Sequence, residues 1–277
     1  MLAELPKYSV LMSLYVKEKP DYLRLAIDSM LNQTVAPDEI VIVEDGPLTD
    51  ALYAVLEEYK SKYPQLFHFV KNKKNLGLGL ALNAGLKECR NEIVARMDTD
   101  DISKPDRCEK QLKFFSERPE TTILGGQIEE FITNPKNIVG KRIVPETDKE
   151  LKDFLKKRCP FNHMTVMFKK SDVMKAGNYQ DWFWNEDYYL WIRLALGKFV
   201  FANLPDTLVH TRVGADMYQR RGGSKYFKSE IDIQKFMLQK GLIKFGTFFM
   251  NCGKRLVVEK LMPNRVRGWV FQKFARK

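Results

Sequence analysis

A short apolar run meets a group of carboxylates in the sequence Glu92-Ile-Val-Ala-Arg-Met-Asp-Thr-Asp-Asp101. The run from Ile93 to Met97 predicts a buried strand, and Asp98, Asp100 and Asp101 follow it directly. Clustered carboxylates repel one another and resist burial unless a cation neutralises them. Alternate carboxylates at the carboxyl end of a strand suit a hard divalent ion that also binds substrate phosphates. For an Asp-x-Asp taken alone, a solvated acidic turn before the next helix is an equally good interpretation.

Strands and helices alternate along the chain that leads to this stretch. Apolar runs predict strands at 9–15, 40–43, 66–70 and 93–97, separated by helical patterns near 20–32, 49–62 and 79–86. This order predicts an α/β fold with a Rossmann-like, mostly parallel sheet and helices on both faces. Because parallel strands end on one side of a sheet, Glu44-Asp45 and the acidic cluster should open at the same edge.

The second half of the chain mixes shorter elements. Strands are predicted at 122–124, 162–168, 199–202 and 207–212, helices at 105–117, 148–157, 171–176 and 188–196, and a hairpin or irregular strands within 127–145. From Ser224 onward the sequence is helical and basic. We therefore divide the chain into a domain at 1–223 and a basic, aromatic-rich helical tail at 224–277.

The charge of the protein lies in that tail. The chain of 277 residues has a net charge of +11, and residues 218–277 carry 15 Lys+Arg against 3 Asp+Glu. The remaining 31 basic and 32 acidic residues nearly cancel. A tail of this kind predicts a polyanionic partner, which could be an acidic membrane, a nucleic acid or an anionic polymer.

The cysteines and the apolar runs bear on the compartment. Four cysteines lie far apart in the sequence, at Cys89, Cys108, Cys159 and Cys252, which predicts reduced thiols in a cytosolic protein and neither a disulfide framework nor a zinc site. No apolar run approaches the roughly 18 residues of a membrane-spanning helix, and the first residues lack the pattern of a secretory signal.

Two early motifs allow alternative interpretations. Gly77-x-Gly79 could cradle a dinucleotide, but Leu82 stands where the third glycine would be, so close packing of the turn is the better interpretation. Asp45 could be a turn residue before Gly46, or a buried carboxylate that accepts a hydrogen bond from a nucleobase.

Glu186-Asp187 begins a helical pattern. The pair could simply favour the helix dipole, or it could supply a general base with its neighbour. Nearby Trp182, Trp184 and Trp191 could desolvate such a carboxylate and raise its pKa, and aromatic surfaces also suit sugar rings.

The histidines lie far apart in the sequence. His163 and His210 are near the later strands, where either could reach the site. We keep a metal-ligand role for His210 beside the more ordinary interpretation as a core or surface residue.

Taken together, these residues resemble the family 2 inverting glycosyltransferases, which have the GT-A fold. The resemblance spans about residues 9–223, and the order and spacing of its motifs make it specific. Its marks are Ser9-Val-Leu-Met-Ser-Leu-Tyr15, Ser29-Met-Leu-Asn-Gln-Thr34, Glu39-Ile-Val-Ile-Val-Glu-Asp-Gly46, Asn75-x-Gly77 with Asn83, Arg96-Met-Asp-Thr-Asp-Asp101, Pro105-Asp-Arg107, Asn185-Glu-Asp187 with Leu190, Trp191 and Arg193, and Arg212-Val-Gly214 through Arg220-Arg-Gly-Gly223. The likeness is strongest to bacterial enzymes of capsule, exopolysaccharide and O-antigen assembly.

The resemblance implies roles for individual residues. It makes the protein a metal-dependent hexosyl- or N-acetylhexosaminyl-transferase in which Mn²⁺ or Mg²⁺ binds the diphosphate of a UDP-sugar. By resemblance, Asp45 contacts the uracil, Asp98 and Asp100 hold the metal, and Asp187 beside Glu186 deprotonates the acceptor hydroxyl. The implied contacts are Ser13, Tyr15, Asn83 and Asp98 for the nucleotide sugar, Trp184 and Trp191 for the acceptor, and His210 as a further metal ligand.

The sequence departs from the family pattern at several positions. Leu82 replaces an Arg that often precedes Asn83, Met164 follows His163 where Pro is frequent, and Glu44-Asp-Gly-Pro47 replaces an Asp-Asp-Gly-Ser. The first departure puts one diphosphate contact in doubt, and none of them touches the metal pair or the base.

The tail has its own interpretation. Aromatic and aliphatic residues interleave with Lys and Arg without spanning length, which predicts an interfacial anchor on an anionic membrane. The alternative is a helix packed on the catalytic domain with a solvated basic face. Lipid-linked oligosaccharide acceptors, implied by the resemblance, would place the enzyme on the cytoplasmic face of a bacterial membrane.

Two other classes of function compete with this hypothesis. A nucleotide-sugar-binding scaffold without turnover is disfavoured by the intact acidic pairs. A basic nucleic-acid-binding protein is disfavoured because the body is nearly neutral and the tail has no recognisable nucleic-acid motif, so we expect no nucleic-acid partner.

Overall fold

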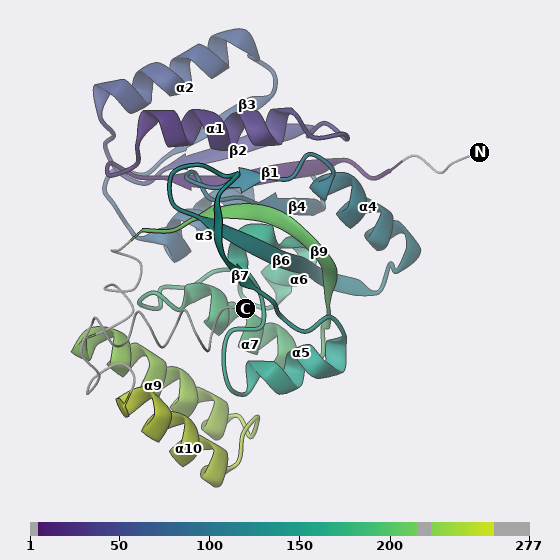
Figure 1. Cartoon of the computed structure of the whole chain (residues 1–277), viewed down its shortest axis with the longest axis vertical. Helices are drawn as coiled ribbons and strands as arrows, with labels where there is room; N and C mark the ends of the chain where they lie inside the picture. Colours follow the sequence, from purple (N-terminus) through teal and green to yellow (C-terminus); the bar gives the residue numbers. More distant parts are fainter. Residues whose placement is uncertain (1–4, 215–222, 258–277) are drawn as a thin grey trace.

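The structure is a computed structural model that describes residues 5–214 and 223–257. In this part of the chain, one nine-stranded sheet has the order β3-β2-β1-β4-β8-β6-β9-β5, with β7 paired to β6. Figure 1 shows α1 and α2 on one side of the sheet and α5, α7 and α9 on the other. The GT-A fold expected from the sequence is therefore observed as a mixed α/β sheet with helices around it.

The first half of the sheet is parallel, as the alternating pattern predicts. Its strands are β1 (Tyr8–Leu14), β2 (Glu39–Glu44), β3 (Phe67–Lys71) and β4 (Ile93–Arg96), connected by α1 (Pro20–Leu31), α2 (Asp50–Lys62) and α3 (Leu78–Glu88). Leu14 pairs with Glu44, and Leu11 pairs with Arg96. This register brings the ends of β2 and β4, which carry Asp45 and the acidic cluster, to one edge.

The second half contains the antiparallel pairs. Its elements are β5 (Ile102–Ser103), α4 (Arg107–Glu117), β6 (Thr121–Phe131), β7 (Ile138–Arg142), α5 (Asp148–Leu155), β8 (Met167–Lys169), α6 (Lys170–Lys175), α7 (Glu186–Leu196) and β9 (Val200–Arg212). Strand β8 runs antiparallel to β4 and β6, whereas β6 and β9 are parallel to each other.

Two sequence predictions in this half need correction. Residues 163–165 form a short 3₁₀ turn, so the strand expected at 162–168 begins only at Met167. The two strands expected at 199–202 and 207–212 are one continuous strand, whose pairing with β6 shifts register between Gly125 and Gln127 and again between Gln127 and Ile128. The irregular pairing lets the chain pass through Pro205 without leaving the sheet.

The core consists of two clusters, one on each face of the sheet. Val10 and Met12 of β1 point into the cluster beneath α1, α2 and α4, and Leu11 points into the opposite cluster with α3 and α7. This alternation follows from the period of two along a strand. It explains why β1 is apolar on both faces and buried.

The tail begins as part of the packed body. Helix α9 (Ser224–Gln239) buries Ile233 and Met237 in the second cluster, and α10 (Phe245–Arg255) packs against α9. The Ser229 hydroxyl donates to the Phe183 carbonyl at 2.6 Å. The last part of the predicted tail, residues 258–277, lies outside the described residues. Within the described part of the chain, no helix is long and apolar enough to cross a membrane.

Helix α3 approaches the sheet through Gly85. A Cβ at this position would lie 2.5 Å from Cγ2 of Val43 and 2.6 Å from Cδ1 of Leu11. We expect Gly85→Ala to lower the free energy of unfolding by about 1–3 kcal/mol, because the helix must move away from a close-packed core. Urea unfolding measures the change.

Gly246→Ala is the matched control, because a Cβ there meets nothing within 4 Å in α10. We expect that variant to be neutral or slightly stabilised. Equal midpoints for the wild type and Gly85→Ala would contradict the packing argument.

A candidate active site at the carboxyl edge of the sheet

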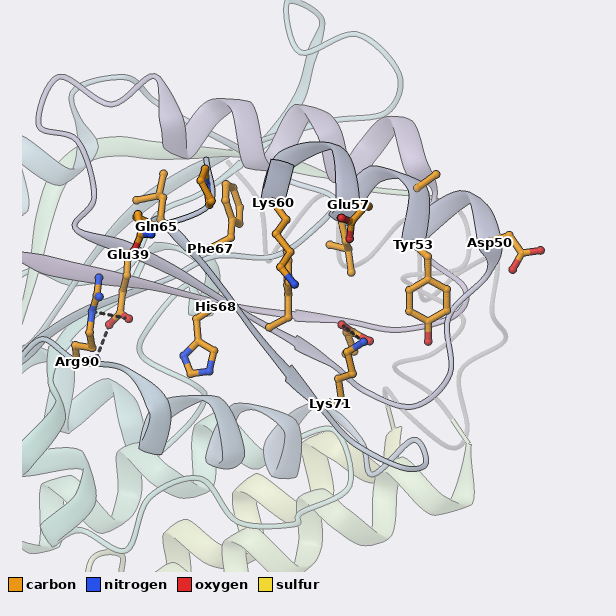
Figure 2. Close-up of a pocket in the computed structure, with 16 residues that line it drawn as sticks. Glu39, Asp50, Tyr53, Glu57, Lys60, Gln65, Phe67, His68, Lys71 and Arg90 are labelled. Carbon is orange, nitrogen blue, oxygen red and sulfur yellow. Dashed lines mark hydrogen bonds and ion pairs between the residues drawn. The ribbon is translucent and has the colours of Figure 1, made fainter. Parts of the chain in front are cut away.

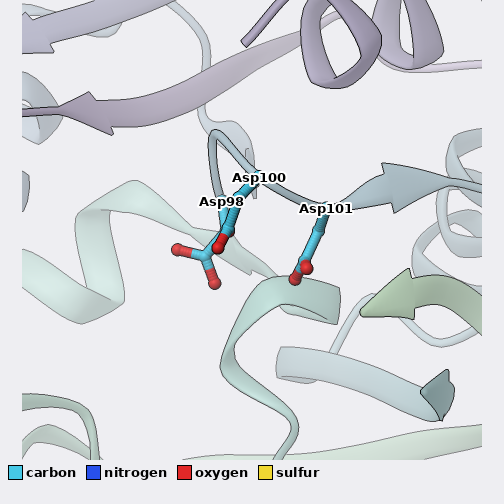
Figure 3. Close-up of side chains that lie close together, drawn as sticks. All are labelled: Asp98, Asp100 and Asp101. Carbon is cyan, nitrogen blue, oxygen red and sulfur yellow. The ribbon is translucent and has the colours of Figure 1, made fainter. Parts of the chain in front are cut away.

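Three carboxylates meet on the loop between β4 and β5. Asp98, Asp100 and Asp101 each place one oxygen within 4.8 Å of the others, and Figure 3 shows their side chains together on that loop. The Asp101 side chain is buried, and its Oδ1 accepts a hydrogen bond from the Arg212 amide at 2.7 Å. Its Oδ2 has no hydrogen-bond partner within the described residues. A buried carboxylate oxygen without a donor, beside two further carboxylates, fits a hard divalent cation.

The electrostatics of the cluster point the same way. Burial, with the charges of Asp98 and Glu18, raises the pKa of Asp100 to about 7. Burial and the two neighbouring carboxylates raise the pKa of Asp101 well above its ordinary range. Both groups hold protons more tightly than usual because their negative charges are crowded and poorly solvated. A divalent cation relieves both causes.

Arg96 neutralises part of this charge. Arg96 is 1% exposed at the end of β4, and its guanidinium forms a two-pronged ion pair with the Asp98 carboxylate. Sequence reasoning assigned no role to Arg96. The sequence contains a signal for this role, which is a charged residue inside an apolar strand. Such a residue is rarely buried without a partner, so a nearby carboxylate is expected.

Asp45 holds the turn that precedes α3. Its Oδ1 accepts hydrogen bonds from the Leu76 amide at 2.8 Å and the Asn72 side chain at 3.0 Å, and its Oδ2 accepts one from the Gly77 amide at 3.0 Å. Gly46 follows with a φ of +91°, where a Cβ would lie 2.6 Å from the Asn75 amide nitrogen. Since each carboxylate oxygen can accept two hydrogen bonds, Oδ2 retains one position. Contact with a nucleobase stays a prediction.

The same turn reaches the first residues of α7. A Cβ on Gly79 would lie 2.8 Å from the Glu186 Cβ, so the glycine permits this close approach. The close-packing interpretation of Gly77-x-Gly79 therefore holds at its second glycine. The Asp98 charge also contributes to the raised pKa of Glu186. Asp45, the acidic cluster and the start of α7 thus lie around one edge of the sheet.

Glu186 and Asp187 differ in their surroundings. Burial and the Asp187 charge raise the pKa of Glu186 to about 8. Burial also raises the pKa of Asp187. Two hydrogen bonds to its carboxylate oppose this rise: Oδ1 accepts one from the Tyr188 amide at 2.7 Å, and Oδ2 accepts one from the Cys159 thiol at 3.5 Å. Of the two carboxylates, Glu186 therefore holds a proton more readily than Asp187 does.

The remaining predicted contacts differ in accessibility. Ser13 and the exposed Tyr15 lie at and just beyond the end of β1. The Asn83 amide donates to the Tyr179 carbonyl at 2.6 Å and so ties α3 to the 178–180 segment. Trp184 is 48% exposed with a φ of +54° and stacks on Phe183 at 4.6 Å between ring centroids.

The arrangement of the side chains does not support two of the predicted contacts. Trp191 is 0% exposed and packs edge-on against Phe161 and His163, so an acceptor cannot contact it in this structure. His210 lies outside the cluster of possible metal ligands found among the described residues, and its Nδ1 faces Glu129 at 3.5 Å. Burial helps keep the pKa of His210 below its ordinary value.

A hollow of about 830 Å³ lies elsewhere, between α2 and β3 at the edge of the sheet (Figure 2). Two of its carboxylates are already paired, Glu39 with Arg90 and Glu44 with Lys71. Among the described residues, the group of possible metal ligands is the acidic cluster and not the lining of this hollow.

Comparison with known proteins identifies the family. Residues 9–173 match the model of glycosyl transferase family 2. The chain belongs to glycosyl transferase family 2. This family 2 chain is 46% identical to an uncharacterized glycosyltransferase of Haemophilus influenzae over 98% of this chain and 100% of the relative.

Other relatives of this family 2 member have more specific names. It is 40% identical to the amylovoran biosynthesis glycosyltransferase AmsE of Erwinia amylovora, over 96% of this chain and 98% of AmsE. It is 38% identical to a UDP-Gal:alpha-D-GlcNAc-diphosphoundecaprenol beta-1,3-galactosyltransferase of Escherichia coli, over 100% and 99% of the two chains.

Solved structures share the fold of this family 2 chain. S. aureus TarS 1–349 in complex with UDP has a TM-score of 0.66 at 17% identity, over 96% of this chain and 75% of that chain. The mannosyltransferase PcManGT of Pyrobaculum calidifontis, in complex with GDP-Man and Mn²⁺, has a TM-score of 0.66 at 15% identity, over 96% and 72% of the two chains. The family and fold expected from the sequence are confirmed.

The raised pKa of Asp100 has a consequence for stability. Its ordinary value is 3.8 and its folded value is about 7, so the folded protein binds this proton more tightly than the unfolded chain does. In EDTA, stability should therefore fall as the pH rises from about 4 to 7. Between these pH values, the free energy of unfolding of Asp100→Asn should decrease less than that of the wild type, by on the order of 2 kcal/mol. Urea unfolding at several pH values measures the difference.

Mn²⁺ should raise the melting temperature of the wild type at pH 7 and have little effect on Asp100→Asn. Asp181→Asn changes an exposed acid and is the matched control. Identical pH profiles and identical Mn²⁺ responses in wild type and Asp100→Asn would contradict the described electrostatics.

Proposed function

We propose that this protein is an inverting, metal-dependent glycosyltransferase that moves a sugar from a UDP-sugar to a hydroxyl of a lipid-linked oligosaccharide. The reaction would serve the biosynthesis of a cell-surface polysaccharide. The observation that carries the proposal is that the acidic cluster and the start of α7, where Asp187 follows Glu186, lie at one edge of a family 2 fold. The names of the amylovoran and galactosyltransferase relatives support the donor, the acceptor and the pathway class.

Each part of the edge has a role in this proposal. The free acceptor position on Asp45 suits the ring N–H of uracil. Asp98, Asp100 and Asp101 would hold Mn²⁺ or Mg²⁺, and the Mn²⁺ in the PcManGT complex supports a metal of this type. A divalent cation in that place offsets the charge that builds on the leaving diphosphate.

Asp187 supplies the base. Its carboxylate takes the proton of the acceptor hydroxyl while the oxygen attacks the anomeric carbon from the face opposite the diphosphate, and this single displacement inverts the configuration. The raised pKa brings Asp187 closer to the pH at which it works. Glu186 holds a proton at neutral pH, which limits the negative charge beside the base. The exposed Trp184 beside this pair suits the acceptor sugar.

The outer face of α10 supports contact with a membrane. Phe245 is 65% exposed and Phe249 is 58% exposed, whereas Asn251 on the inner side is 3% exposed. The Asn251 amide donates to Gln234 and to the Lys156 carbonyl, both at 2.8 Å. The helix thus turns Asn251 and Phe248 toward the body and leaves Phe245 and Phe249 exposed, whereas an ordinary surface helix exposes mainly polar side chains.

Exposed Lys244 and Lys254 accompany this apolar face. Apolar side chains beside lysines suit the interface of an anionic membrane. We therefore place the enzyme on the cytoplasmic face of the bacterial membrane, where it would meet a lipid-linked acceptor.

Substitutions in the acidic pair test the base. We expect Asp187→Asn to lower kcat for transfer from a UDP-sugar by about 10²–10⁴-fold, because an amide cannot accept the proton. UDP binding, measured by calorimetry, should be unchanged.

Glu186→Gln is the matched control, since an amide resembles the protonated acid, and we expect its kcat at pH 7 to stay within about threefold of the wild type. Undiminished transfer by Asp187→Asn would remove Asp187 as the base. UDP binding without product for any acceptor would favour a scaffold without turnover.

Substitutions on α10 test the membrane surface. We expect Phe245→Ser with Phe249→Ser to weaken flotation with phosphatidylglycerol-containing vesicles about tenfold or more, because two large apolar groups leave the interface. Val139→Ser is the matched control, because Val139 is 55% exposed on β7. Equal flotation of all three proteins would exclude this face as the contact.

A further inference from the structure

The Cys159 thiol lies against the carboxylate of the proposed base. Its Sγ is 3.5 Å from Oδ2 of Asp187, and it also lies 3.6 Å from the Phe161 carbonyl oxygen. A thiol has one hydrogen, so it can donate to only one of these acceptors at a time. The charged carboxylate is the stronger acceptor.

The main chain around Cys159 is held in place by Arg142. The Arg142 guanidinium donates to the Cys159 carbonyl at 2.7 Å, to the Phe161 carbonyl at 2.9 Å and to the Asn162 side chain at 2.7 Å. Three hydrogen bonds from one planar group fix the position of the thiol relative to β7. The fold therefore holds the thiol in place as a donor to the Asp187 carboxylate.

Both oxygens of the Asp187 carboxylate accept hydrogen bonds. The Tyr188 amide donates to Oδ1 at 2.7 Å from the helix side, and the thiol donates to Oδ2 from the loop side. Each oxygen keeps one acceptor position free. These two contacts fix the rotation of the carboxylate and leave positions at which an acceptor hydroxyl can bind.

Other charged groups also act on Asp187. Glu186 neighbours it on α7, and the positive charges of Arg96 and Arg142 lower its pKa. Tyr179 faces the same pair from the 178–180 segment. Among these groups, Cys159 is the side chain with a hydrogen bond to the Asp187 carboxylate within the described residues.

We propose that Cys159 is a positioning residue, whose S–H orients the Asp187 carboxylate for removal of the proton from the acceptor hydroxyl. The proposal rests on the proposed role of Asp187. The acceptor proton passes to the carboxylate, and the thiol keeps its own proton throughout. Burial and the Asp187 charge raise the pKa of Cys159 well above its ordinary value, which prevents the thiol from acting as an acid or base itself.

Three variants separate this role from a merely structural one. We expect Cys159→Ala to lower kcat about tenfold with the donor KM unchanged, because the carboxylate loses one orienting donor. The acidic limb of the kcat profile should move to higher pH, since the thiol contact lowers the pKa of Asp187. Cys159→Ser should restore both values, because it restores a donor.

Cys252→Ala is the matched control, since Cys252 is also half-buried but lies on α10. It should leave kcat and the pH profile unchanged. A Cys159→Ala enzyme with the wild-type kcat and pH profile would overturn the proposal. Full activity of Asp187→Asn would instead contradict the proposed role of Asp187 as the base, on which the role of the thiol rests.

Thiol alkylation tests the contact without any change at Cys159. Iodoacetamide labelling, followed by mass spectrometry for each cysteine, should modify Cys159 several-fold faster in Asp187→Asn than in the wild type at pH 8. The reason is that the neighbouring negative charge opposes ionisation of the thiol. Cys252 provides the internal reference, and an unchanged ratio of the two rates would overturn the contact.

Discussion

One buried guanidinium makes it possible to gather several carboxylates at one edge of the sheet. Arg96 lies beneath the loop that carries the acidic cluster, and its positive charge partly offsets the rise that burial causes in the pKa values of four carboxyl groups, those of Asp100, Asp101, Glu186 and Asp187. Burying that many carboxylates without a cation would strongly destabilise the fold. The Arg107 guanidinium donates to the Arg96 carbonyl at 2.8 Å and anchors the end of β4 from inside the core. The site is therefore built outward from a charge that solvent barely reaches.

Much of the fold could be predicted from the sequence because its first half is locally consistent. Apolar strands and helical spacing alternate from Tyr8 to Arg96, and the parallel arrangement follows from that order. The later half depends on pairing between distant segments. Nothing in the local pattern shows that β9 is one strand of 13 residues or that β8 runs antiparallel to β4. Register of that kind is fixed by tertiary packing.

The site residues that directly follow strands could be predicted from the sequence. The sequence could not show which nearby side chains are buried in the core instead of facing the site. Asp98 and Asp100 follow β4, and the sheet carries them to the edge. Trp191 is one helical turn beyond Asp187, and that turn takes it under the site into the aromatic core. His210 stands opposite Glu129 on the neighbouring strand, a pairing set by the irregular register of β6 and β9. In α10, composition indicated the aromatic and basic character but not that Asn251 turns inward.

The contacts of Asp45 carry a consequence for the evolution of donor choice. One carboxylate holds the Asn72–Gly77 turn through three hydrogen bonds and has a single acceptor position left to face a ligand. A substitution of Asp45 that allowed a different nucleobase to bind would also remove the hydrogen bonds that hold the turn before α3. Under the proposed contact with the base, a new base preference is therefore easier to reach by substitution at neighbouring positions than at Asp45 itself.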